Sequence, residues 1–185
     1  MEWKDVLSTR ISCRKYAERP VEREKVLACV EAARLAPSGH NAQRWRFIVV
    51  DDADKRARIS EAAAKPGTPI NRFCRNIPVL IVLVKEQPAP FEHESDPCLN
   101  ENRIWDVDMG IAAEHICLEA TSQGLGSIIL GRLSEPEIKE TLDIPQELEV
   151  PLIVGIGYAL NPDTPPRPRR PLSEVACYNS YKTAL

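Results

Sequence analysis

Residues 104–122 read IWDVDMGIAAEHICLEATS and lead into Gly124-Leu125-Gly126. This segment is the longest helix that the sequence predicts, and apolar residues occupy nearly every side of it. A helix of this kind has to be buried in a core or against a partner. The glycines end the helix, and residues 127–130 then predict a short strand.

Further strands and helices are expected on both sides of this helix. Residues 77–84 are a continuous apolar run rich in β-branched residues, the pattern of a strand buried on both faces. Asp52 is an expected N-cap, and the segment that begins at Ser134 has a capping-box pattern. Helices packed on a sheet of short strands indicate a layered α/β or α+β domain. The other expected strands are residues 45–50 and 150–158, and the expected shorter helices are residues 3–9, 21–35, 53–64 and 134–142.

The composition is that of an ordinary globular chain, and we expect one domain over residues 1–185. A chain of this length can bury about 70% of its unfolded surface, so it needs no disulfide or metal to hold its core. A net charge of −3 argues against nucleic-acid or acidic-membrane binding by bulk electrostatics, and the longest apolar run is too short to span a bilayer. The N-terminus lacks a basic region followed by an apolar core, so we expect a cytoplasmic protein whose six cysteines are free thiols.

Two cationic groups are candidate anion sites. Arg10, Ser12 and Arg14 alternate, so an extended segment would point them to one side. Two guanidinium groups beside a hydroxyl suit phosphate or carboxylate, and the alternative is a solvated basic turn. Arg167 and Arg169 lie on a stiff, proline-rich segment, which suits a fixed anion but also a tail that binds nothing.

Polar side chains also gather in the loop at residues 37–43, which reads PSGHNAQ. Loops that collect polar groups at strand ends often contact a ligand. His40 is a candidate base or metal ligand, but no second histidine is near it in the sequence, and we expect no metal site. A Gly-x-Ser-x-Gly motif is absent, which argues against a Ser/His/Asp triad. Leu130 and Gly131 follow the glycine turn, where backbone either approaches a flat ligand or forms only a cap and a turn.

Taken in this order, these segments resemble the FMN-dependent nitroreductase family, from Arg10 to about Tyr178. The helix at residues 104–122 and its glycine turn also look like the central helix of that family. The resemblance implies a three-layer α+β fold with a mostly antiparallel central sheet flanked by helices. It further implies an intertwined homodimer with FMN at the subunit interface, and a C-terminal extension at about residues 159–185 that wraps the partner subunit.

An activity follows from the same resemblance. The family passes hydride from NAD(P)H through FMN to nitroaromatic, quinone or similar acceptors by a ping-pong mechanism. Flavin N5 carries that chemistry, so no side chain is assigned as catalytic, and His40 is a candidate for supplying the proton. The alternatives are the same fold with other flavin chemistry, such as reductive dehalogenation or flavin breakdown, or a flavin-binding or sensing protein without turnover. The implied cofactor-binding residues are Arg10, Ser12, Arg14, Ser38, Gly39, His40, Asn41, Leu130, Gly131, Arg167 and Arg169.

The resemblance distributes these residues over two subunits. Residues 38–41 would approach the flavin from the partner subunit, while Arg10, Arg167 and Arg169 would meet its phosphate. Leu130 and Gly131 would offer backbone near N5.

The chain departs from the family pattern at Arg44, where proline is frequent, which leaves a role in substrate binding or at the interface open. Residues 87–100 are the candidate lid, and residues 68–76 are the region of an unassigned ribityl contact. The sequence assigns neither the physiological acceptor nor a choice between NADH and NADPH.

Overall fold

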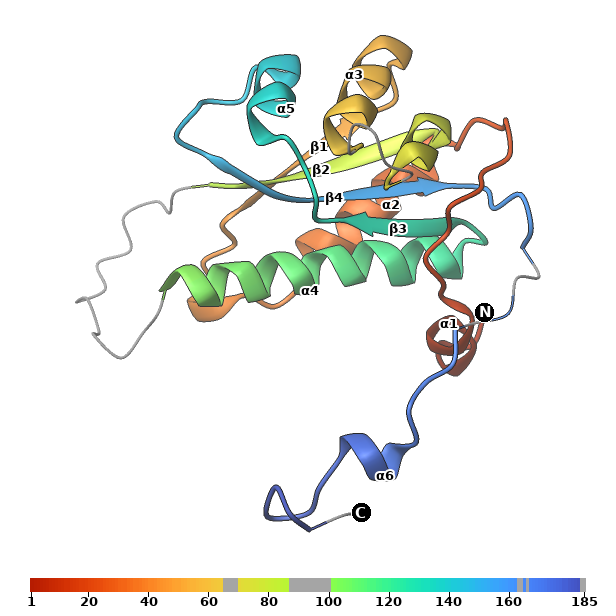
Figure 1. The fold of residues 1–185 in the computed structure, drawn as a ribbon, viewed down its shortest axis with the longest axis vertical. Helices are drawn as coiled ribbons and strands as arrows, with labels where there is room; N and C mark the ends of the chain where they lie inside the picture. The colour runs from red at the N-terminus through yellow and green to blue at the C-terminus, as the bar shows by residue number, and fades with distance from the viewer. Residues whose placement is uncertain (65–69, 87–100, 163–164, 166, 184–185) are drawn as a thin grey trace.

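Four strands form one sheet with the order β1-β2-β4-β3, and every neighbouring pair is antiparallel (Figure 1). The computed structural model describes residues 1–64, 70–86, 101–162, 165 and 167–183. Strand β2 lies inside the sheet and is buried at all seven positions, as its apolar sequence predicts for a strand covered on both faces. The strands are β1 (Trp45–Val50), β2 (Val79–Lys85), β3 (Gly126–Leu130) and β4 (Glu149–Gly157).

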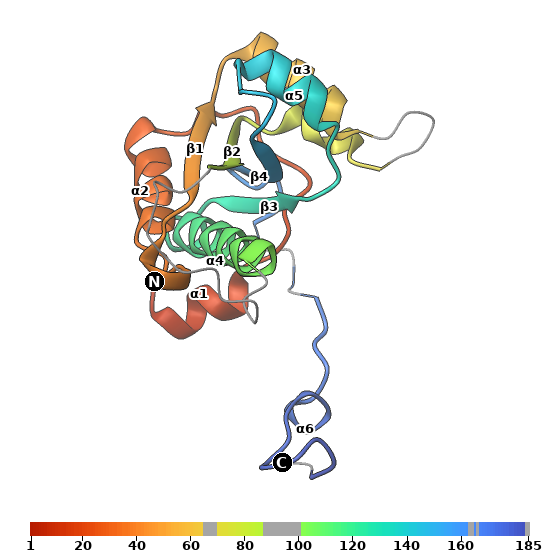
Figure 2. The same cartoon turned by 90° about the vertical axis from the view of Figure 1, so that its left-hand side faces the viewer.

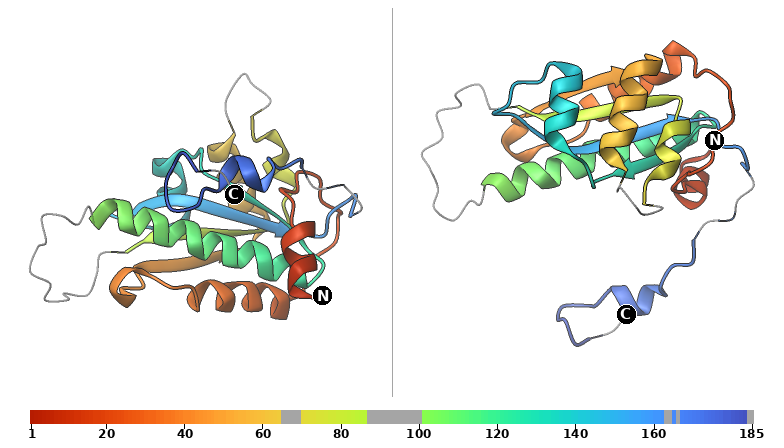
Figure 3. Two further views of the ribbon diagram at one scale, coloured as in Figure 1. Left: turned by 90° about the horizontal axis from the view of Figure 1, so that it is seen from below. Right: turned by 45° about the horizontal axis from the view of Figure 1, so that its top comes forward.

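One face of the sheet is covered by α2 (Arg23–Arg34) and α4 (Glu101–Ser122), which lie side by side (Figure 3, left). Helix α1 (Trp3–Thr9) packs against the C-terminal end of α4. The opposite side of α4 is open, and Val107 there is 54% exposed. Within a single chain, the predicted burial of the apolar helix at residues 104–122 is therefore met on the side of α4 that faces the sheet. The residues of α4 that face the core are at most 1% exposed: Met109, Ala112, Ala113, Ile116, Cys117 and Ala120.

The other face carries α3 (Ala53–Ala63), α5 (Glu135–Leu142) and the short helix η2 (Arg72–Asn76), which completes three layers (Figure 2; Figure 3, right). The Asp52 cap is confirmed, since its side chain accepts from the Lys55 amide at 2.9 Å. The capping box at Ser134 is wrong, although the helix that it announces is present. Ser134 makes no side-chain cap bond, and its amide, which would donate to Glu137 in a capping box, donates to the Ala62 carbonyl at 2.9 Å instead.

Two segments outside the four strands, one after α1 and one after β4, are bridged to each other or to the sheet. Ser12 forms a parallel bridge with Ser127 of β3, and Tyr16 forms an antiparallel bridge with Ala159. After β4 the chain leads away from the body of the molecule to α6 (Leu172–Val175) (Figures 1 and 2). The apolar side chains of this tail are exposed, Leu172 by 69% and Val175 by 57%.

The five cysteines within the described residues are free thiols, and Cys98 lies outside those residues. Burial raises the pKa of Cys29 to about 12 and that of Cys117 to about 11, so both thiols stay protonated and pack as small hydrophobes. Across the described part of the chain, no helix has the length and apolar character to cross a membrane. The same residues contain no cluster of three or more His, Cys, Asp or Glu side chains that could hold a metal ion.

Candidate functional site

A cationic pocket of about 320 Å³ lies where the segment after α1 meets the chain that follows β4. Three of its side chains, Arg14, Lys15 and Arg167, are positively charged, and the lining residues that the structure describes include no acidic one. Charge-assisted hydrogen bonds from several cations are what a phosphate group needs when it leaves water. The lining residues are Ile11, Ser12, Cys13, Arg14, Lys15, Asn161, Pro165 and Arg167.

The backbone beneath this pocket is fixed by the sheet. The Cys13 amide donates to the Ser127 carbonyl at 2.7 Å, and the Cys13 and Tyr16 side chains are buried. Because Cys13 points inward, its neighbours Ser12 and Arg14 point outward and are exposed. The alternation that the sequence suggested therefore places these two side chains on the pocket side.

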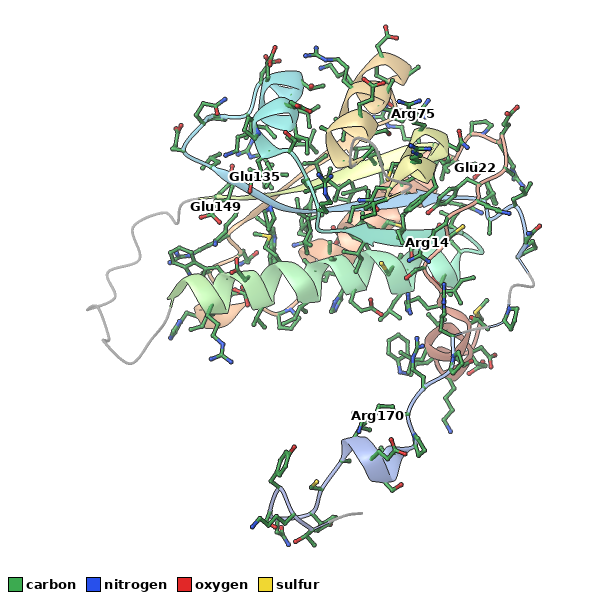
Figure 4. All side chains as sticks on the ribbon, viewed as in Figure 1. Arg14, Glu22, Arg75, Glu135, Glu149 and Arg170 are labelled. Carbon is green, nitrogen blue, oxygen red and sulfur yellow. The ribbon has the colours of Figure 1, made fainter. Side chains whose placement is uncertain are left out.

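Arg14 is held in place by two contacts. Its guanidinium donates to the Ser12 carbonyl at 3.2 Å and lies 5.8 Å from the centre of the Phe73 ring, over η2. Figure 4 shows Arg14 beside the end of the sheet at which β3 begins. Phe73 belongs to the region 68–76 and contacts the candidate phosphate site through Arg14.

The remaining arginines of the predicted set do not line the pocket. Arg10 turns towards α4, where its Nε lies 3.6 Å from Glu114 Oε1. Arg169 is exposed and donates to the Arg167 carbonyl at 2.9 Å, which braces the turn that carries Arg167. Lys15 and Asn161 do line the pocket and were missed, although Lys15 continues the basic run of Arg10 and Arg14 in the sequence.

The 38–43 loop has an unusual backbone. His40, Asn41 and Gln43 have positive φ angles of 53°, 55° and 47°, and the first two belong to the short helix η1 (Gly39–Asn41), which follows Ser38. The Gly39 amide donates to both carboxylate oxygens of Asp108, at 3.1 and 3.2 Å. Left-handed residues other than glycine are uncommon and cluster at functional sites.

Helix α4 separates the loop from the cationic pocket. Asp108 contacts the loop from the first half of α4, whereas the pocket lies beyond its last turn, where β3 begins. From Asp108 to the C-terminal residue of α4, Ser122, is roughly 21 Å along a helix. Leu130 is buried and Gly131 exposed at the far end of β3 from the Cys13 contact. A single chain thus brings Ser12, Arg14 and Arg167 together but not residues 38–41.

A family model for nitroreductases matches residues 7–72 and 65–158 of this chain. The chain belongs to the nitroreductase family. The match ends at residue 158, just after β4.

Individual members of the nitroreductase family are similar to most of the chain. A protein of Archaeoglobus fulgidus, provisionally named an NADH dehydrogenase or NAD(P)H nitroreductase, is 32% identical over 157 residues and covers 83% of each chain. The iodotyrosine deiodinase of Thermotoga neapolitana is 26% identical over an alignment of 198 residues, with 96% of this chain and 97% of its own covered. The solved structure of an FMN-dependent nitroreductase from Clostridium difficile has a TM-score of 0.77 and 29% identity, with 96% and 99% covered.

The expected nitroreductase family and its three-layer α+β fold are therefore confirmed. The names of the relatives also agree with the expected enzyme class, with FMN and with NAD(P)H. The candidate lid at residues 87–100 lies outside the described residues.

Arg44 packs on the first turns of α4. Its guanidinium lies 3.7 Å from the centre of the Trp105 ring. Lys85 Nζ lies 5.5 Å from the same ring and 3.1 Å from carboxylate oxygens of both Asp106 and Glu149. Figure 4 places Glu149 at the opposite end of the sheet from Arg14, so this cluster is remote from the cationic pocket.

Proposed function

We propose that the protein is an FMN-dependent oxidoreductase that passes hydride from NAD(P)H to nitroaromatic, quinone or similar acceptors. The observation that carries this proposal is the pocket on which Arg14, Lys15 and Arg167 converge. A dianionic phosphate matches this donor set, because arginine offers paired donors and the Ser12 hydroxyl adds another. The pocket volume of about 320 Å³ also lies within the usual range for ligand sites.

Each residue near the pocket has a distinct part in this proposal. Arg14, Lys15 and Arg167 bind the phosphate, and Arg169 keeps Arg167 in place. Arg10 is held by Glu114 in the single chain and would have to leave that pair to reach the same phosphate. The backbone at Leu130 and Gly131 is proposed to lie along the flavin ring. When bound, FMN supplies the hydride acceptor and donor, so the chain needs to bind and orient it rather than provide a nucleophile.

We further propose that the working unit is a homodimer. Ser38, Gly39, His40 and Asn41 lie across α4 from the pocket of their own chain, so they are available to the cofactor of a second copy. The exposed side of α4 and the exposed apolar residues of the tail need a cover that one chain does not supply. In this proposal, the extension at about residues 159–185 wraps the partner subunit. Nothing in this arrangement calls for a nucleic acid or a membrane.

Reductive dehalogenation is the second candidate activity, because the iodotyrosine deiodinase of Thermotoga neapolitana aligns with almost the whole chain. A screen of quinones, nitroaromatics and halogenated phenols against the FMN-loaded protein with NADH or NADPH separates the two. Turnover of the halogenated phenols alone would replace the first activity by the second. The free thiols of the described residues favour a reducing compartment, and we propose the cytoplasm.

The colour of the purified protein tests the cofactor directly. It should be yellow, and heat denaturation should release FMN rather than FAD. A colourless protein that takes up no FMN when the two are mixed would refute the proposed function.

A further inference from the structure

We propose that Asp108 is a positioning residue whose buried carboxylate sets the conformation in which the 38–43 loop meets the cofactor of the partner subunit. This inference rests on the proposed function, since it presumes that the loop contacts FMN across a dimer. It goes further because it gives a role to a carboxylate on α4 that does not itself touch the cofactor.

The contact between Asp108 and the loop is direct and shielded from water. Both carboxylate oxygens accept from the Gly39 amide, at 3.1 and 3.2 Å, and Asp108 is 4% exposed. A buried carboxylate is costly unless hydrogen bonds satisfy it, so a hydrogen bond in this position restrains the loop strongly. Its neighbour Met109 is 1% exposed in the core, which keeps this part of α4 from moving with the loop.

Gly39 allows the loop to come this close. A Cβ atom added to Gly39 would lie 2.5 Å from Ile104 Cγ2, which is closer than carbon atoms approach each other. The φ angle of Gly39 is not left-handed, so the obstacle to a side chain is this contact and not the backbone conformation. Gly39 therefore permits the approach that its amide hydrogen bond to Asp108 requires.

The residues after Gly39 need an external restraint. His40, Asn41 and Gln43 all adopt the left-handed conformation, which is unfavourable for residues other than glycine because of their Cβ atom. Inside the loop, the Gln43 amide donates to the Ser38 hydroxyl at 3.0 Å, which closes the turn but does not attach it to the body. The Asp108 carboxylate supplies that attachment at the beginning of the loop.

A second contact on the same helix holds the end of the loop. Arg44 directly follows Gln43, and its guanidinium stacks 3.7 Å from the centre of the Trp105 ring. Trp105 and Asp108 are three residues apart on α4 and share one face of the helix. The loop is thus fastened at both ends to one rigid surface, while His40 and Asn41 between the two points remain exposed to a second copy.

The test compares Asp108→Asn with Asp106→Asn in the full-length protein. Asp106 is two residues away on the same helix but is exposed and pairs with Lys85, not with the loop. Asparagine keeps the size of Asp108 and loses its charge, so we expect the FMN dissociation constant, measured by flavin fluorescence titration, to rise about tenfold. The Asp106→Asn value should stay within twofold of wild type. Thermal unfolding without FMN reports whether either change acts through stability.

A suppressor pair provides the second test. Gly39→Ala should weaken FMN binding about tenfold, because the new methyl group pushes the loop from Ile104. Ile104→Ala alone should change FMN affinity little, and Gly39→Ala combined with Ile104→Ala should return to within threefold of wild type. Thermal unfolding of the same variants without FMN shows whether the rescue acts on the loop or on the stability of the whole chain.

The outcomes separate this inference from the function on which it rests. A wild-type protein that binds no FMN overturns the proposed function. FMN binding that is equal in Asp108→Asn and Asp106→Asn overturns only the positioning role. A fall in the unfolding temperature of Asp108→Asn with unchanged FMN affinity would also overturn it, as would failure of the suppressor pair.

Discussion

Removing Lys85 and removing its partners should have very different effects on stability. The Lys85 side chain is 5% exposed, whereas those of Asp106 and Glu149 are 63% and 60% exposed. Replacing both carboxylates, in Asp106→Asn with Glu149→Gln, leaves a buried ammonium without a countercharge, and losses of about 3 to 5 kcal/mol are typical for such a change. Lys85→Met instead returns two carboxylates to water and keeps an unbranched chain in the core, so we expect a change within about 1 kcal/mol.

Thermal and urea unfolding of the variants without FMN measure these differences. For a chain of this size, a loss of 3 to 5 kcal/mol lowers the unfolding temperature by roughly 6 to 20 °C. Asp106→Asn alone should cost no more than about 1 kcal/mol, because Glu149 remains and both carboxylates are exposed. If Lys85→Met destabilised the protein as much as the double replacement, the assignment of the cost to the buried charge would be wrong.

The same cluster predicts a pH dependence. Burial by itself lowers the pKa of Lys85, but hydrogen bonds to Asp106 and Glu149 outweigh it, and the pKa lies above its ordinary value of 10.5. A cation whose pKa is raised by folding stabilises the folded state fully below its unfolded pKa, and this contribution is lost as the pH rises through the folded value. Wild type should therefore lose stability relative to Lys85→Met above about pH 10.5. Urea midpoints at neutral pH and at high pH provide the measurement.

The remaining predictions concern the cofactor and the dimer. Arg14→Ala and Arg167→Ala should each weaken FMN binding by about 2 kcal/mol, roughly 30-fold, because each removes a charged donor from the phosphate. Arg19→Ala is the control, since Arg19 pairs with Glu22 outside the pocket, and an equal effect of all three changes would contradict the phosphate assignment. Double-reciprocal plots at several acceptor concentrations should be parallel, and His40→Ala should keep substantial turnover. Intersecting lines, or no turnover in His40→Ala with FMN bound, would contradict this. Light scattering of the FMN-loaded protein should give the mass of two chains, and the mass of one would exclude the dimer.

The parts of the fold that depend on local sequence were predicted well. Strand β2 follows from a run of valine, leucine and isoleucine residues, and the Asp52 cap follows from a short side chain before a helix. The capping box at Ser134 failed because the Ser134 amide donates to the Ala62 carbonyl, a partner 72 residues earlier in the chain that the local motif does not reveal. Lys85 extends β2 by one residue beyond the apolar run, since partners 21 and 64 residues away neutralise its charge. Such partners leave no signal in the sequence beside the lysine.

Of the predicted cofactor-binding residues, Ser12, Arg14 and Arg167 line one pocket, and the sequence did not reveal this grouping. Arg10, Arg167 and Arg169 were expected together, yet Glu114 turns Arg10 aside, and Arg14 lies with Arg167 instead. The sequence alone did not predict the contact between Arg44 and Trp105, because Trp105 is 61 residues later in the chain. Asp108 was visible as one of the few acids in an apolar helix, but spacing alone does not connect it to Gly39.

The position of α4 between the pocket and the 38–43 loop has a genetic consequence. In the proposed dimer, each site takes Arg14 from one chain and Asn41 from the other. A mixed dimer of an Arg14→Ala chain and an Asn41→Ala chain would then have both lesions in one site and none in the other. Two inactive alleles expressed in the same cell would restore one working site per mixed dimer. Two substitutions that both lie at the pocket, or both in the 38–43 loop, would leave one lesion in each site of the mixed dimer. Such pairs would not complement each other.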